Sequence, residues 1–252
     1  MPSLIQAIIL SIVQGITEWI PVSSSGHLIL FQKFLGIQDS QTPYYVFLHL
    51  ASVFAVIVFF WKDILNIFKN KNLNYLLLIV IAIIPAGIIG LVFMKEIENL
   101  FSSSFYLGLF FIFSGVIVYL TKFSIPRKEK ISFFDSLLIG IFQVLAVLPG
   151  VSRSGMTISS GLFAGLTKKQ SIKFSFLMLI PIILGAFLVK ADELVLSEIS
   201  YFLLILSFII TFLVSLVTIK LLIKVIESDN FYLFGVYNIV LGIVVLIWSL
   251  IN

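Results

Sequence analysis

The sequence QGITEWIPVSSSGHL, residues 14–28, places a carboxylate, three consecutive serines, a glycine and a histidine inside otherwise apolar sequence. A second polar break, PGVSRSGMT at residues 149–157, lies in the other half of the chain and carries one of only two arginines. Ionisable groups inside membrane sequence are costly and by default mark functional sites. We therefore interpret the two breaks as the two halves of one site.

The apolar composition decides the class of protein. The 252 residues are 60% hydrophobic and 11% charged, with a mean hydropathy of +1.19, whereas soluble domains carry about 25% charged residues. The charges cluster between long apolar runs, which predicts an all-α polytopic membrane protein surrounded by membrane lipids. The absence of cysteine excludes disulfides and thiol chemistry. The net charge of +4 comes mostly from loop lysines, without the aromatic-interleaved basic patch expected for nucleic-acid binding.

Each polar break separates a longer apolar segment from a short one. Residues 4–20 are followed by 28–35, and residues 133–148 are followed by 156–165. Because the second segments are too short to cross a bilayer, both pairs are predicted to be re-entrant helical hairpins. About six further apolar runs are predicted to be full spans, at residues 44–61, 75–94, 104–121, 174–189, 200–222 and 231–251.

The two hairpins belong to an internal repeat. Shifting the sequence by 129 residues aligns VSSSG with VSRSG, so that Ser24 stands opposite Arg153. The repeats extend approximately over residues 4–121 and 133–251 within a single membrane domain, 1–252. Similarity outside the motifs is weak, as is usual for the internal repeats of transporter-type folds.

Loop charge predicts an orientation. The basic loops 62–74 and 122–132 are expected in the cytoplasm, and the acidic loops 95–103 and 190–199 outside. The two repeats then have inverted topology, and the hairpins enter from opposite faces. Their broken tips are expected to meet inside the membrane, with the active site facing outside.

Glu18 is the first candidate for chemistry. Gln14 and Glu18 are four residues apart, so both project from one helix face. The alternative for Glu18 is a carboxylate exposed at the level of the lipid headgroups. His49 lies in the middle of a predicted span, where we expect a histidine bonded to a backbone carbonyl and without a catalytic role.

The serine run suits an anion-binding helix start. Ser23, Ser24 and Ser25 precede Gly26 and His27, and serines cap helices whose first N–H groups bind anions. Capping alone is the alternative for any one of the three serines. The histidine is a candidate general acid, general base or nucleophile, and a purely structural role is its alternative.

Arg153 is the predicted phosphate ligand, because a guanidinium presents a planar fork of donors to phosphate. A snorkelling arginine is the alternative, although lysine occupies the membrane-edge positions elsewhere in the chain. Neighbouring residues can add hydroxyl or amide groups or permit close backbone approach. The expected substrate-binding set is Gln14, Ser23, Ser25, Gly26, Gly150, Ser152, Ser154, Gly155 and Thr157.

The two motifs resemble those of the undecaprenyl-diphosphatase family, the bacitracin-resistance type of integral membrane phosphatase. The family pattern Glu/Gln-x-x-x-Glu followed by PVSS-x-GH matches residues 14–27, and PG-x-SRSG-x-T matches 149–157. The resemblance covers the whole chain and implies removal of the terminal phosphate of undecaprenyl diphosphate, on a fold of inverted repeats with paired re-entrant hairpins. It also implies a divalent cation, Mg²⁺ or Ca²⁺, with Glu18 as metal ligand. Many members carry Glu at position 14, so that second carboxylate is missing here.

A mechanism follows from the resemblance and the residues together. The diphosphate is expected between the hairpin tips, bound by Arg153 and backbone N–H groups. Ser24 attacks the terminal phosphorus, with His27 or water as alternative nucleophiles, and Glu18 orients His27 or binds the cation. A transporter or lipid-phosphate flippase is the alternative function, because inverted repeats with broken helices are typical of transporters. The plasma membrane is the expected location. The oligomeric state stays open, a homodimer being one alternative.

Overall fold

The computed structural model describes residues 2–37, 42–93, 96, 97, 100, 103–196 and 199–251. Within these residues the chain forms eleven α-helices and one short 3₁₀ turn, with no strand beyond an isolated bridge between Lys128 and Leu166. Five helices are long and apolar enough to cross a membrane, and a sixth span results if the bent pair α3–α4 is counted as one. The structure therefore confirms the predicted all-α polytopic membrane fold.

The two predicted hairpins consist of short helices with matching caps. The first is α1 (Leu4–Thr17) and α2 (Ser24–Phe34), and the second is α8 (Phe133–Leu145) and α9 (Arg153–Phe163). At 14 and 13 residues, α1 and α8 are too short to span a bilayer. Ser3 and Ser132 close equivalent capping boxes 129 residues apart.

The second helix of each hairpin begins earlier than predicted. The expected starts at 28 and 156 are wrong, because the side chains of Ser23 and Ser152 cap α2 and α9 by accepting from the N–H groups of Gly26 and Gly155. The polar residues of both motifs therefore lie in the first turn of a helix, where the side-chain directions are defined by the helix.

The remaining helices are α4, which lies in a predicted loop, and six helices that agree with the predicted spans except at their ends. They are α3 (Thr42–Phe59), α4 (Trp61–Lys69), α5 (Leu73–Val92), α7 (Ser104–Leu120), α10 (Lys168–Leu196), α11 (Tyr201–Glu227) and α12 (Leu233–Ile251). Helix α10 continues into the segment 190–199, which was predicted as a loop. The acidic loop expected at 95–103 falls mostly outside the described residues.

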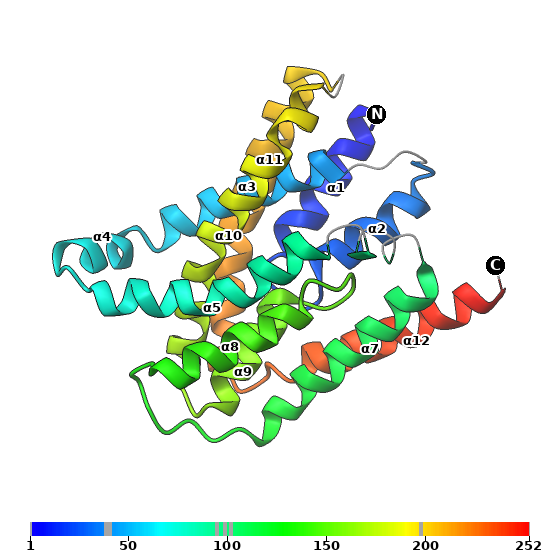
Figure 1. Ribbon diagram of the computed structural model, residues 1–252. Coiled ribbons are helices and arrows are strands. Elements are labelled where there is room, and N and C mark those ends of the chain that lie inside the picture. The colour runs from blue at the N-terminus through cyan, green and yellow to red at the C-terminus, as the bar shows by residue number, and fades with distance from the viewer. Residues whose placement is uncertain are drawn as a thin grey trace.

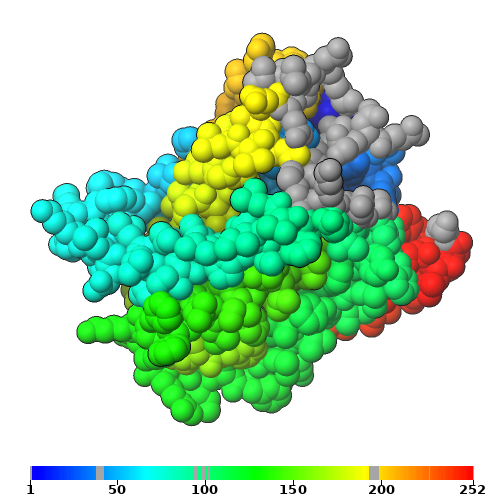
Figure 2. Space-filling model, in the orientation of Figure 1, coloured from blue at the N-terminus to red at the C-terminus, as the bar shows by residue number. Residues whose placement is uncertain are grey.

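The predicted loop at 62–74 is instead mostly helical. Helix α4 follows α3 after a bend of 68°, and it projects from the side of the bundle (Figures 1 and 2). Asp63 lies in its first turn and Lys69 in its last, the charge arrangement that favours the helix dipole. Ile64 and Ile67 pack against the core, which holds the helix to the bundle.

Each hairpin packs against a helix from the other half of the chain. Helix α1 lies against α11 and α8 lies against α5, while α3 pairs with α10 and α7 runs alongside α12 (Figure 1). In the core, Trp19 of the first break meets Phe176 of α10 edge to face, with ring centroids 4.9 Å apart. The outer faces of the helices carry exposed apolar residues such as Leu77, Ile205 and Val244. Such faces are suited to lipid.

Candidate functional site

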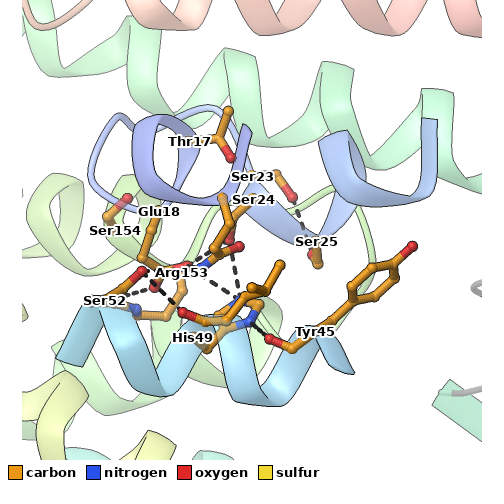
Figure 3. Close-up of polar contacts among 12 residues, drawn as sticks. Thr17, Glu18, Ser23, Ser24, Ser25, Tyr45, His49, Ser52, Arg153 and Ser154 are labelled. Carbon is orange, nitrogen blue, oxygen red and sulfur yellow. Dashed lines mark hydrogen bonds and ion pairs between the residues drawn. The ribbon is translucent and has the colours of Figure 1, made fainter. Parts of the chain in front are cut away.

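The site is built around the buried carboxylate of Glu18, at the C-terminal cap of α1 (Figure 3). Its Oε1 accepts from Arg153 Nη2 at 2.9 Å, and its Oε2 accepts from Ser24 Oγ at 2.7 Å. Gln14, one turn earlier on α1, donates from Nε2 to Oε2 at 3.0 Å. The contact of Glu18 with Arg153 joins the two hairpins through residues that are 135 positions apart in sequence. The two polar breaks therefore meet in the folded chain.

The repeat explains why Ser24 and Arg153 reach the same carboxylate. Each is the first residue of its helix, and each directly follows the serine that caps it, Ser23 or Ser152. The two positions are related by the shift of 129 residues. The starts of two helices thus present a hydroxyl and a guanidinium to one carboxylate.

The breaks approach this closely because both contain glycine. A Cβ atom on Gly26 would lie 2.5 Å from Phe111 Cζ and 3.2 Å from the Cα of Gly150. Gly150 has φ +94°, and its Cβ would lie 2.9 Å from the carbonyl oxygen of Leu107. Close backbone approach was predicted for Gly150 and Gly155, and around Gly150 the structure leaves no room for a side chain.

Arg153 is held in place by α10 as well as by Glu18. Its Nη1 donates to the carbonyl oxygen of Ser175 at 3.1 Å, and the Ser175 hydroxyl lies 2.6 Å from Thr157 Oγ1. Thr157 Oγ1 also donates to the Arg153 carbonyl at 2.9 Å. The arginine side chain is 16% exposed, against 5% for that of Glu18. The Arg153 side chain is therefore the more exposed member of the ion pair.

The other predicted serines form hydroxyl pairs beside the cluster. Ser23 Oγ lies 3.4 Å from Ser25 Oγ, and Ser152 Oγ lies 3.3 Å from Ser154 Oγ. Ser152 also receives support from α7, because its N–H donates to Ser114 Oγ at 3.1 Å. These hydroxyls line the two helix starts without contacting Glu18 in the described contacts.

The predicted contact between Glu18 and His27 is wrong. His27 Nδ1 lies 2.9 Å from the carbonyl oxygen of Ser23, and its Nε2 lies 2.8 Å from Tyr237 Oη on α12. The imidazole stacks on Tyr237, with ring centroids 5.8 Å apart. Both ring nitrogens are engaged on the side of the hairpin that faces α12.

His49 of α3 takes the position expected for His27 (Figure 3). Its Nε2 lies 3.3 Å from Glu18 Oε2 and 3.4 Å from Ser24 Oγ. Its Nδ1 donates to the carbonyl of Tyr45 at 2.7 Å, so the expected backbone bond is present. Since a carbonyl can only accept, that bond places the Nδ1 proton and leaves Nε2 of a neutral ring as the acceptor.

Two further serines were missed by the sequence reasoning. One is Ser175, described above, and the other is Ser52, three residues after His49 on α3. Ser52 Oγ lies 3.5 Å from Gln14 Nε2 and accepts from Ser215 of α11 at 3.3 Å. A polar pair at i and i+3 in an apolar span is the signal that could have indicated this face.

The oxygen donors near Glu18 are compatible with a hard cation. The described residues contain no group of three or more His, Cys, Asp or Glu side chains that could hold a metal ion. Gln14 Oε1, however, is buried and has no hydrogen-bond partner. An orphaned amide oxygen next to a carboxylate suits Mg²⁺ or Ca²⁺ when phosphate oxygens of a substrate complete the coordination.

Comparisons with known proteins identify the family of the chain. Residues 7–244 match the family model described as bacitracin resistance protein BacA. An undecaprenyl-diphosphatase from Thermosipho africanus is 38% identical, with 94% of this chain and 97% of the relative covered. Relatives of the same name from Methanosphaera stadtmanae and Halothermothrix orenii are 34% and 36% identical, with 100% and 96% of both chains covered.

Proposed function

The chain belongs to the bacitracin resistance protein BacA family, and we propose on that premise that it is an undecaprenyl-diphosphatase. It removes the terminal phosphate of undecaprenyl diphosphate, giving undecaprenyl phosphate and inorganic phosphate, and so recycles the lipid carrier of cell-wall synthesis. The observation that carries the proposal is the contact of a hydroxyl, a carboxylate and a guanidinium from two separate breaks, inside an apolar bundle. The names of the relatives support the same reaction.

Substrate binding is assigned to Arg153 and the start of α9. Arg153 has the more exposed side chain of the ion pair, and the planar fork of its guanidinium can bind two phosphate oxygens. The first-turn N–H groups of α2 and α9 add donors from both sides. As charge develops on the phosphoryl oxygens, these preorganised donors stabilise it. The polyprenyl chain lies against the apolar outer faces of the helices.

Ser24 is the proposed nucleophile. Its hydroxyl already donates to Glu18 Oε2 at 2.7 Å, so the carboxylate can take the proton as Oγ bonds to the terminal phosphorus. The bond from phosphorus to the bridging oxygen breaks, and undecaprenyl phosphate leaves. Water then attacks the phosphoserine, releases inorganic phosphate and restores the hydroxyl. His49 Nε2, near both groups, is a second acceptor for the proton.

A divalent cation, Mg²⁺ or Ca²⁺, is the proposed cofactor. Glu18 and Gln14 Oε1 would hold it, and bound cation supplies neutralisation of the diphosphate charge. Gln14 contributes an amide oxygen without a second negative charge. Weaker cation binding than at a site with two carboxylates is therefore expected.

A lipid flippase would need Arg153 for binding but no bonded pair like Ser24 and Glu18. That pair, together with the names of the relatives, favours hydrolysis. A homodimer remains one alternative for the assembly.

We place the protein in the plasma membrane with the site open to the outside, from the loop charges and the direction of the first hairpin. Sealed vesicles of known orientation test this with a water-soluble short-chain diphosphate. Right-side-out vesicles should release phosphate, and activity confined to inverted vesicles would overturn the orientation.

The central experiment is phosphate release from undecaprenyl diphosphate by the purified protein. The Ser24→Ala variant should lose about a thousandfold or more in kcat, because among the described residues only the Ser24 hydroxyl donates to Glu18. Ser249→Ala is the matched control, since Ser249 only donates to a carbonyl within α12 at 2.7 Å. Near-normal turnover by Ser24→Ala would exclude Ser24 as nucleophile, and no release by the wild-type protein would refute the function.

A further inference from the structure

The turn that presents Ser24 has a strained backbone. Ser23 has φ +67° and ψ 94°, a conformation that residues with a Cβ rarely adopt. Its oxygen atoms are heavily used: Oγ accepts from the N–H of Gly26, and the carbonyl accepts from the backbone N–H of His27 at 3.1 Å. A strained residue persists only where its surroundings hold it, so the neighbours of Ser23 determine where Ser24 lies.

His27 supplies a second bond to the same carbonyl. Its Nδ1 lies 2.9 Å from Ser23 O, and since a carbonyl has no proton, Nδ1 is the donor. Nε2 is then the acceptor in a neutral ring, and the Tyr237 hydroxyl donates to it at 2.8 Å. The ring is 6% exposed, stacked on Tyr237 and edge-on to Phe111. Its position is thus defined by contacts on several sides.

Helix α12 also holds the other side of the break. Asn238, fully buried, donates from Nδ2 to the carbonyl of Pro21 at 2.7 Å. Tyr237 and Asn238 are adjacent in sequence, and they support the two ends of the segment 21–23. Asn238 bonds directly to Pro21, and Tyr237 bonds to His27, which in turn bonds to the carbonyl of Ser23. The last helix of the chain therefore contacts the backbone on which the nucleophile depends.

We propose that His27 and Tyr237 are positioning residues, which hold the strained Ser23 turn so that Ser24 Oγ stays on Glu18 Oε2. The inference rests on the proposed function, in which Ser24 is the nucleophile, and it removes His27 from proton transfer. Through Nδ1 the imidazole acts as a hydrogen-bond donor to a carbonyl, and an amide can replace it in that role. A displacement of the nucleophile by about 1 Å can cost about a hundredfold in rate.

Two amide substitutions separate positioning from acid–base catalysis. In His27→Asn the side-chain NH₂ can take the place of Nδ1–H, whereas in His27→Gln it reaches toward the position of Nε2. Neither amide can transfer a proton at neutral pH. We expect His27→Asn to keep kcat within about tenfold of wild type, and His27→Gln and His27→Ala to lose about a hundredfold. Equal loss in all three variants would overturn the proposal.

A double-mutant cycle tests the strain itself. Glycine adopts positive φ with little cost, so the turn should need less support once Ser23 is replaced by glycine. We expect the loss caused by His27→Ala to be about tenfold smaller in a Ser23→Gly background than in the wild-type background. An equal loss in both backgrounds would contradict the proposed role. Tyr237→Phe should lower kcat by about threefold to tenfold, and Tyr232→Phe, directly before the same helix, is its control.

A readout independent of activity separates this inference from the proposed function. Hydrogen–deuterium exchange of the segment 19–27 in the full-length protein should be faster in His27→Ala and His27→Gln than in His27→Asn and wild type. This order of exchange rates would support the positioning role of His27 whatever the activity. If the wild-type protein released no phosphate, only the proposed function would be refuted. Exchange that is unchanged in His27→Ala would refute the positioning role whatever the activity.

Discussion

Replacing Arg153 by lysine tests whether Arg153 binds the phosphate of the substrate or serves only as the ion-pair partner of Glu18. The guanidinium contacts two elements at once, Glu18 at 2.9 Å through Nη2 and the carbonyl of Ser175 at 3.1 Å through Nη1. A lysine keeps the positive charge but has a single nitrogen. It cannot span both acceptors and also present a fork to phosphate.

The magnitude follows from the contacts that are lost. A hydrogen bond to a charged group is worth about 1.5–3 kcal/mol, and about 1.4 kcal/mol corresponds to a factor of ten. Loss of one bidentate contact to the transition state should thus lower kcat/KM by about a hundredfold, as for removal of an oxyanion donor. Stability should fall less, by about 1–2 kcal/mol, since the charge beside Glu18 remains.

An Arg153→Met variant provides the comparison. It leaves a carboxylate whose side chain is 5% exposed without its positive partner, and breaking a buried pair in this way costs about 3–5 kcal/mol. Arg153→Lys and Arg153→Met should therefore be similarly inactive but differ clearly in thermal stability.

The assay is phosphate release at several substrate concentrations, together with thermal unfolding in detergent. Arg127→Lys is the matched control, because the other arginine lies exposed in the loop before α8. Activity of Arg153→Lys within threefold of wild type would refute the role of the guanidinium fork. If the activities of Arg153→Lys and Arg153→Met fell in proportion to their thermal stabilities, Arg153 would have only a structural role beside Glu18.

Three further predictions follow from the same contacts. Gly26→Ala should lower both activity and stability, the latter by about 1–3 kcal/mol in thermal unfolding, because the added Cβ would lie 2.5 Å from Phe111. Asp135→Asn should cost about 1–2 kcal/mol of stability with little change in kcat, since the Asp135 carboxylate accepts from the Ser132 N–H in the capping box of α8 and from Lys128 at 2.7 Å. Burial raises the pKa of Asp135, but the hydrogen bonds from Lys128 and Ser132 outweigh burial, so the pKa is lowered in the folded protein. The stabilisation by Asp135 should therefore be complete near neutral pH and lost as the pH falls through the lowered pKa. Unfolding measured at a series of pH values tests this. Chelation should abolish phosphate release until Mg²⁺ or Ca²⁺ is restored, and full activity in the presence of chelator would exclude the cation as cofactor. Gln14→Glu should reduce the cation concentration needed for half-maximal activity.

Several features of this protein could be predicted from the sequence because they depend on local chemistry. Polar residues in apolar sequence must be satisfied within the protein, so the two motifs identified the breaks and indicated that they share a site. The contact of Glu18 with Arg153 shows that the two breaks meet in the folded chain. The repeat was visible because both hairpins use serine caps and glycines at the same spacing.

Local signals were weaker at the ends of the helices. A serine run can be a loop or the cap and first turn of a helix, and only the bonds of Ser23 and Ser152 to the following N–H groups distinguish the two. The charges of 62–74 suggested a loop, but the apolar residues between them pack onto the core and stabilise α4. That helix depends on a surface contributed by other parts of the chain.

Which histidine meets Glu18 was decided only by the tertiary structure. His27 is nine residues from Glu18 in sequence, yet the first turn of α2 directs its ring toward Tyr237, 210 residues away. His49 belongs to α3, an apolar helix whose hydrophobic pattern does not indicate which face is buried. The packing of α3 beside the first hairpin places His49 Nε2 3.3 Å from the Glu18 carboxylate. Sequence spacing determines which side chains share a face of one helix. Which face meets which neighbour depends on the rotation and packing of whole helices, and those are set by side chains from distant parts of the chain.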